Sequence, residues 1–220
     1  MSKYAAEAIG TFALVFAGTG AVVINNLTAG SVSHVGIALT FGLIVMSMIY
    51  AVGDVSGAHL NPAVTIGFFV ARRLKVRLVL PYIASQLLGA TLASIFLLAM
   101  FGNRAALGAT QPAGSAWQSF FLEAVLTAIL MFVILCVSTG SKEVGTMAGI
   151  AIGGVIALEA LFAGPICGAS MNPARSLAPA IVSGNLHALW IYLTAPIIGS
   201  VTAVPLWRAT REDQIHSKTP

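Results

Sequence analysis

The chain has very few charged residues. Lys, Arg, Asp and Glu together make up only 8% of its 220 residues, whereas 58% are hydrophobic, and the mean hydropathy is +0.93. So little charge cannot cover the surface of a soluble domain, and this composition is typical of a membrane protein.

Cysteine is also scarce, and the motifs of several functional classes are missing. Cys136 and Cys167 lie about thirty residues apart without metal-ligand spacing, so we expect no metal site. No basic patch interleaved with aromatic residues is present, so we expect no nucleic acid partner. No nucleophile and base pair, phosphate-binding loop or metal cluster accompanies the membrane pattern, so we expect neither an enzyme nor a cofactor.

Long apolar runs are abundant. A membrane-spanning helix needs about 20 apolar residues, and six runs approach that length, at about 4–25, 35–52, 79–101, 117–138, 146–163 and 186–207. The first run resembles a signal peptide, but it contains Glu7 and no convincing cleavage site follows it. We therefore expect an all-α membrane protein with six transmembrane helices.

The basic residues predict the orientation in the lipid bilayer. Loops on the cytoplasmic side carry an excess of Lys and Arg. With six spans, both termini and the connections 71–78 and 139–146 share one side, which holds nine of the eleven basic residues: Lys3, Arg72, Arg73, Lys75, Arg77, Lys142, Arg208, Arg211 and Lys218. We therefore expect a multi-pass protein of the cell membrane with cytoplasmic termini, and the net charge of +4 then follows from this topology.

A tripeptide occurs twice, as Asn61-Pro62-Ala63 and Asn172-Pro173-Ala174. The flanking sequence repeats as well, since residues 6–11 resemble residues 122–127, and Glu7 matches Glu123. Each copy contains three helices, an odd number, so the second copy enters the membrane from the opposite side. We expect one structural domain built from two inverted repeats, 1–110 and 111–220.

Each tripeptide lies in a segment too apolar for a solvated loop and too rich in Gly and Pro for a full span. Asn is a good N-cap and Pro fits the first helical turn. This predicts re-entrant half-helices at 61–71 and 172–182. Irregular backbone inside a bilayer is tolerated where it lines a cavity, so the preceding residues should present carbonyl groups to a pore: Gly57, Ala58, His59, Leu60, Gly168, Ser170 and Met171.

Inverted symmetry brings the two half-helix N-termini together near the midplane, where each carries about +0.5 of an elementary charge. Asn61 and Asn172 would offer side-chain N–H groups to a passing oxygen. Cations then meet a barrier, and an oriented chain of water molecules does not relay protons.

Three acidic residues within helices need partners, because an ionised group in hydrocarbon is costly. We expect Glu7 and Glu123 to accept hydrogen bonds from the re-entrant backbone. Glu159 has three alternatives: it is protonated, it braces the loop around Arg175, or it touches the pore. His59 either packs beside the pore with its carbonyl exposed there or senses pH.

The segments Ser56–Thr65 and Gly168–Ser176, taken together, resemble the aquaporin and aquaglyceroporin superfamily. The motifs Met48–Gly53 and Ala163-Gly164-Pro165 resemble its nodulin-26-like intrinsic proteins. The resemblance covers essentially the full chain and implies a homotetramer with one pore in each subunit.

The resemblance also implies a four-residue constriction on the extracellular side, formed by Phe41, Ala160, Ala169 and Arg175. Water-selective members usually carry His at the position of Ala160, so this constriction should be wider and less polar. The alternative for the two alanines is ordinary packing of small residues between membrane helices. Ser176 departs from the glycerol facilitators, which typically have Asp there.

These observations predict a passive channel for small uncharged solutes: water, glycerol, and neutral metalloid acids such as arsenous, boric or silicic acid. A strict water channel is the alternative. An inverted-repeat secondary transporter would need a coupling-ion site, and a junction protein would need longer loops. The compact chain also suggests a microbial inner membrane.

Overall fold

The computed structural model describes residues 2–139 and 146–210, which form long helices without strands. Six helices in this part of the chain are long and apolar enough to cross a membrane. They are α1 (Lys3–Leu27), α2 (Ser33–Ser56), α4 (Val76–Phe101), α5 (Ala116–Val137), α7 (Ala148–Cys167) and α9 (Leu189–Ala209).

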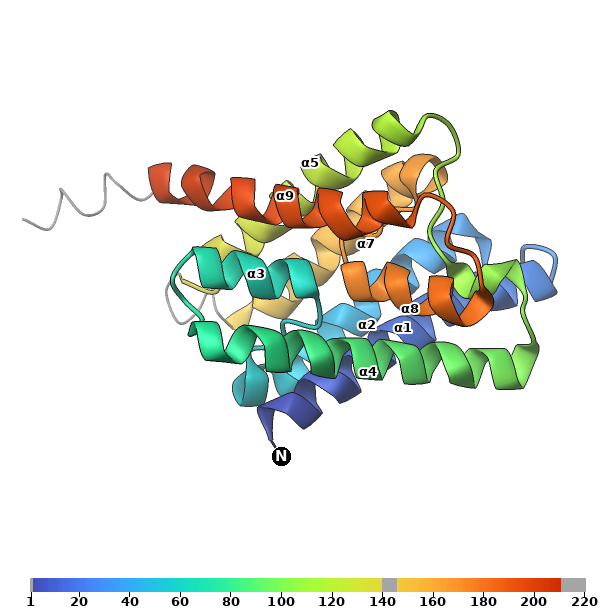
Figure 1. The fold of residues 1–220 in the computed structure, drawn as a ribbon, viewed down its shortest axis with the longest axis horizontal. Coiled ribbons are helices and arrows are strands. Elements are labelled where there is room, and N and C mark those ends of the chain that lie inside the picture. The colour runs from blue at the N-terminus through green and yellow to red at the C-terminus, as the bar shows by residue number, and fades with distance from the viewer. Residues whose placement is uncertain (1, 140–145, 211–220) are drawn as a thin grey trace, which may run out of the picture.

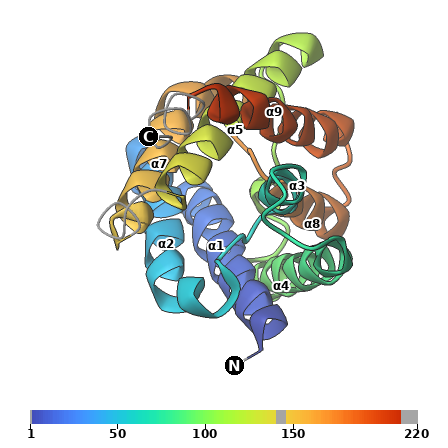
Figure 2. The same ribbon diagram turned by 90° about the vertical axis from the view of Figure 1, so that its left-hand side faces the viewer.

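Two short helices lie inside this bundle. They are α3 (Pro62–Val70) and α8 (Pro173–Ser183), with Asn61 and Asn172 as their N-caps. Figure 1 shows α3 and α8 arranged end to end between α4 and α9, and in the end-on view of Figure 2 they lie one behind the other. Both half-helices thus begin at the residue the sequence predicts, because Asn and Pro suit a helix start.

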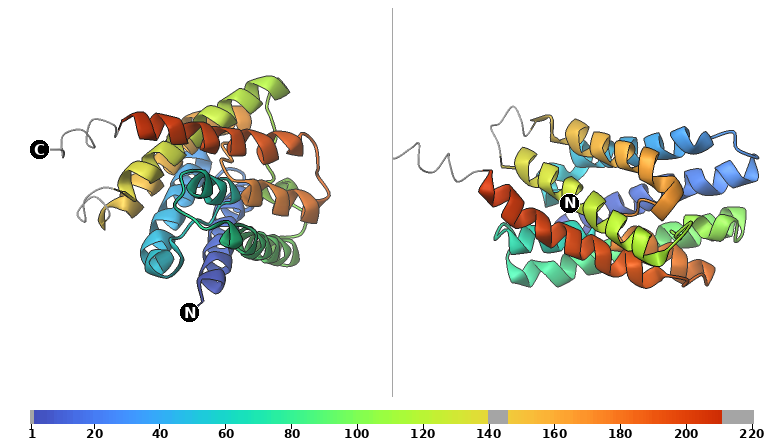
Figure 3. Two further views of the ribbon diagram at one scale, coloured as in Figure 1. Left: turned by 60° about the vertical axis from the view of Figure 1, so that its left-hand side comes forward. Right: turned by 90° about the horizontal axis from the view of Figure 1, so that it is seen from above.

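The helix contacts come in matched pairs. α1 packs on α4 as α5 packs on α9, α1 on α2 as α5 on α7, and α3 on α9 as α8 on α4. The right-hand view of Figure 3 shows α5 lying along α9. In these pairs α1 corresponds to α5, α2 to α7, α3 to α8 and α4 to α9. An inverted 3+3 repeat requires such a matched set of contacts.

Glycines allow the closest helix approaches, and they too are matched. A Cβ atom on Gly89 would lie 2.1 Å from the Ala8 carbonyl oxygen, and one on Gly199 would lie 2.1 Å from the Ala124 carbonyl oxygen. Small residues let membrane helices approach at backbone distance. The two helix pairs are therefore packed backbone against backbone.

Two spans continue four residues past the C-terminal end that the sequence predicts. α2 continues to Ser56 although its apolar run ends at 52, and α7 continues to Cys167 through Pro165 although its run ends at 163. Hydropathy ends a span at the first polar residues or at proline, but both helices continue to the re-entrant loops that follow them. Lys142, Arg211 and Lys218, three of the basic residues used to predict orientation, lie outside the described residues.

A linker joins α4 to α5 across one end of the bundle. It contains the short 3-10 helix η1 (Ala105–Gly108), which packs on α1 and α8. Residues of this linker line one of the two cavities described next.

Candidate solute pore

The backbone before each half-helix takes the same unusual path. Gly57, Ala58 and Leu60 have φ angles of 88°, 47° and 52°, and the equivalent residues Gly168, Ala169 and Met171 have 86°, 40° and 53°. The left-handed region costs a non-glycine residue roughly 1–3 kcal/mol. Four such residues persist here only because the surroundings hold them.

A buried carboxylate holds each of these turns. Glu7 accepts hydrogen bonds from the backbone N–H groups of His59 (2.9 Å) and Leu60 (2.8 Å). Glu123 accepts them from Ser170 (2.7 Å) and Met171 (2.8 Å). These hydrogen bonds hold the strained backbone in place.

The two asparagines lock the turns together. Asn61 Nδ2 donates to the Met171 carbonyl at 2.7 Å, and Asn172 Nδ2 donates to the Leu60 carbonyl at 2.9 Å. Each Oδ1 accepts from the first turn of its own half-helix, from Ala63 and from Ala174. One amide hydrogen of each asparagine is therefore committed to protein, and both asparagines also line the cavity described next.

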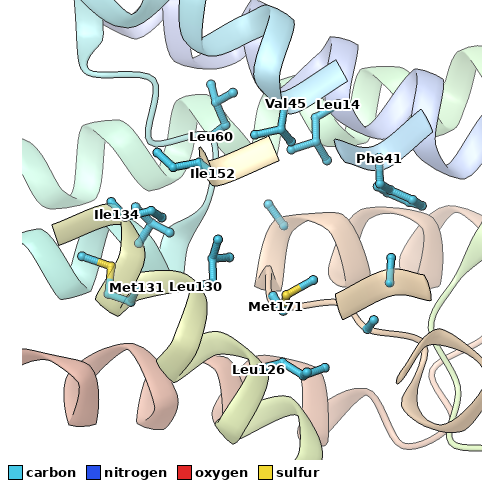
Figure 4. Close-up of a cluster of buried hydrophobic side chains, with 14 of the residues drawn as sticks. Leu14, Phe41, Val45, Leu60, Leu126, Leu130, Met131, Ile134, Ile152 and Met171 are labelled. Atoms are coloured by element: carbon cyan, nitrogen blue, oxygen red, sulfur yellow. The ribbon is translucent and has the colours of Figure 1, made fainter. Parts of the chain in front are cut away.

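An inner cavity of about 130 Å³ runs past both asparagines. Its lining includes the asparagines and Arg175, whose polar groups we call the polar stripe, and the turn residues Gly57, Ala58, His59, Leu60, Ser170 and Met171. Apolar side chains line it as well, and Figure 4 shows Leu14, Val45, Ile134 and Ile152 among them. A solute on this path therefore meets a few hydrogen-bonding groups among apolar side chains.

An outer cavity of about 440 Å³ lies at the linker end of the bundle. Gly168 lines it, together with His34 and the linker residues 105–111 apart from Leu107. In the described part of the chain, four residues line both cavities: Phe41, Ala160, Ala169 and Arg175. They therefore form the boundary between the two spaces, and they are the four residues that the resemblance places at the constriction.

Arg175 is held at this boundary from two directions. Its Nη1 donates to the Gly108 carbonyl at 2.7 Å, and its Cζ lies 4.8 Å from the centre of the Phe41 ring. The Phe41 ring in turn fits against Gly18, where a Cβ atom would lie 2.2 Å from ring atom Cε1. A fixed guanidinium and a fixed ring therefore define two sides of the boundary, and two alanine methyl groups line the rest.

The structure gives the positions of His59 and Glu159, for which the sequence leaves alternative roles open. The His59 ring stacks on Phe68 with centroids 4.5 Å apart, and its Nδ1 lies 3.1 Å from Thr65 Oγ1, so the side chain packs beside the pore. Glu159 is 1% exposed and lines neither cavity. Within residues 2–139 and 146–210 its carboxyl oxygens have no hydrogen-bond partner, so it neither braces the Arg175 loop nor touches the pore in this structure.

The sequence reasoning missed the linker. Gly108 anchors Arg175, and a Cβ atom on Gly108 would lie 2.8 Å from Thr19 Cβ, so this residue needs to be glycine. Its φ of 73° is a second reason. A glycine in a polar connection is the only signal that the sequence carries for this role.

Comparison with known proteins agrees with this architecture. The major intrinsic protein family matches residues 1–207. The chain belongs to the major intrinsic protein family. It is 50% identical over 202 residues to the aquaporin NIP1-1 of Oryza sativa subsp. japonica, covering 91% of this chain and 71% of that protein. It is 43% identical to nodulin-26 of Glycine max, covering 96% of this chain and 78% of that protein.

The fold has a solved counterpart. The structure of the aquaglyceroporin from Plasmodium falciparum superposes with a TM-score of 0.84 at 26% sequence identity, covering 97% of this chain and 98% of that one. Family, fold and pore together confirm the prediction of an aquaporin-like, multi-pass membrane channel for small uncharged solutes, similar to the nodulin-26-like proteins.

Proposed function

We propose that this channel passes glycerol and neutral metalloid acids as well as water, and that Phe41, Ala160, Ala169 and Arg175 select among them. The observation that carries this proposal is the boundary between the two cavities, where two of the four residues are alanines. A methyl group takes little space and makes no hydrogen bond. The boundary therefore leaves room for a solute wider than water.

The polar stripe would replace the water that a solute loses on entry. Arg175 presents guanidinium N–H groups, and Asn61 and Asn172 each keep one amide hydrogen. Hydroxyl groups of a polyol or of boric acid pair with such donors. Cations are excluded because the fixed arginine and the half-helix N-termini make the path electropositive.

We propose that residues 1–110 and 111–220 are the two repeats, and that the protein forms a homotetramer in a cell membrane with both termini cytoplasmic. Lys3, Arg72, Arg73 and Arg77 support this orientation, because cytoplasmic loops are rich in basic residues. The relatives named above are plant proteins, so they give no support to the microbial membrane suggested by the compact chain.

The test is stopped-flow light scattering on proteoliposomes that contain the native chain, Ala160→His or the control Ala160→Ser. We expect the native chain to pass water, glycerol and boric acid. Ala160→His should keep water and lose the larger solutes, because the imidazole fills the boundary, whereas Ala160→Ser adds one oxygen and should keep all three.

A native chain that passes only water would refute this proposal and identify a strict water channel. Solute flux that saturates, or that follows a proton or sodium gradient, would instead identify a secondary transporter.

A further inference from the structure

α7 contains a proline close to the boundary between the cavities. Pro165 has no backbone N–H, so it cannot donate the helical hydrogen bond to the carbonyl of Leu161, four residues earlier. The Leu161 carbonyl therefore lacks this helical donor and can accept a hydrogen bond from a group outside α7.

That partner is the side chain of His34, at the start of α2. Its Nε2 lies 2.7 Å from the Leu161 carbonyl oxygen. A carbonyl oxygen only accepts, so Nε2 carries the proton and donates, as both the neutral Nε2–H tautomer and the imidazolium can. Gly164 leaves room for the ring, because a Cβ atom there would lie 3.0 Å from His34 Cε1.

This hydrogen bond lies close along the chain to three of the four boundary residues. Ala160 precedes Leu161 directly, and the last turn of α7 beyond Pro165 leads into the loop that carries Ala169. Phe41 lies seven residues after His34 on α2, which is two helical turns along the same face. The bond therefore joins α2, which carries Phe41, to α7, which carries Ala160. It lies next to Pro165 in α7.

We propose that His34 is a positioning residue for solute selectivity: its Nε2–H occupies the carbonyl left free by Pro165 and thereby fixes the width of the boundary between the cavities. This inference rests on the proposed function of the boundary. It assigns His34, which lies in the wall of the outer cavity, a role in selection that does not require contact with the solute.

The test is a double-mutant cycle between the two residues. His34→Phe fills similar space without a donor, and His34→Gln keeps an N–H donor. Pro165→Ala restores a backbone N–H that can itself bond to the Leu161 carbonyl, which makes the imidazole dispensable. The readout is the ratio of glycerol to water permeability in proteoliposomes with equal protein content, with size-exclusion chromatography as the control for folding.

We expect His34→Phe to change this ratio by roughly two- to tenfold, the scale of one hydrogen bond. His34→Gln should leave it near the native value, and so should His34→Phe in the Pro165→Ala background. No change in the native background, or the same change in both backgrounds, overturns the proposal, since a residue that only lines the cavity does not depend on Pro165.

The failure of the two proposals can be told apart. If the native chain passes no glycerol, the proposed function fails, and the same cycle is scored on water permeability alone. If His34→Phe does not fold, recovery of folded protein in the Pro165→Ala background supports the hydrogen bond, and no recovery overturns it.

Discussion

Replacing Glu7 with glutamine tests how the first re-entrant turn is held. Four donors reach this carboxylate: Ser56 Oγ and the His59 N–H on Oε1, and the Leu60 N–H and Gln86 Nε2 on Oε2. Glutamine has the same shape but only one accepting oxygen. Whichever way its amide points, two buried donors lose their acceptor.

Glu123 is the matched control at the second turn. It accepts one backbone N–H on each oxygen, from Ser170 and Met171. Glutamine at this position therefore leaves a single backbone donor without an acceptor.

A buried donor left unpaired costs about 1–3 kcal/mol. Glu7→Gln should therefore lower the free energy of unfolding by about 2–6 kcal/mol and Glu123→Gln by about 1–3 kcal/mol. For a chain of this size, the larger loss corresponds to a Tm lower by on the order of 10 °C, and the smaller to about half of that.

The assay is thermal unfolding of detergent-purified protein followed by intrinsic fluorescence, with Asp54→Asn as the surface control. Asp54 is exposed on α2, so its substitution should change stability by no more than about 0.5 kcal/mol. If Glu7→Gln lowers the Tm by no more than Glu123→Gln does, the argument that more donors lose their acceptor at Glu7 is refuted.

Two further predictions concern glycines. Gly89→Ala places its Cβ atom 2.1 Å from the Ala8 carbonyl oxygen, so we expect poor recovery of folded protein on size exclusion. In the control Gly53→Ala the Cβ atom meets nothing within 4 Å, so this variant should fold normally. Equal recovery of the two variants would contradict the close helix contact. Gly18→Ala should push the Phe41 ring away from α1, since the new Cβ atom would lie 2.2 Å from that ring. In stopped-flow measurements this variant should lose more glycerol permeability than water permeability. An unchanged ratio of glycerol to water permeability would show that Phe41 does not limit the path.

Much of the fold follows from local features of the sequence. Apolar runs of about 20 residues predict the six spans, and Asn before Pro predicts where each half-helix begins. Each of these sequence signals lies within, or next to, the helix that it predicts. The repeat of Glu7 as Glu123 extends the prediction to one long-range feature, the placement of a carboxylate near each re-entrant turn.

Three other features that depend on distant partners were not predictable. The carbonyl of Leu161, which Pro165 leaves without its helical donor, meets a side chain 127 residues away in the chain, at His34. The anchoring of Arg175 depends on the Gly108 carbonyl, in a linker without a recognisable motif. Composition also gave no sign that each asparagine would use one amide hydrogen on the opposite turn.

The hydrogen bonds around the two turns also imply an order of assembly during synthesis. All four donors to Glu7 belong to residues 56–86, so the ribosome has made every partner in this set before α5 begins. The bonds of Asn61 and Asn172 to the opposite turn need residues 171 and 172. The first turn can therefore take its shape early, while the junction at the centre of the pore closes only after both re-entrant segments have entered the membrane.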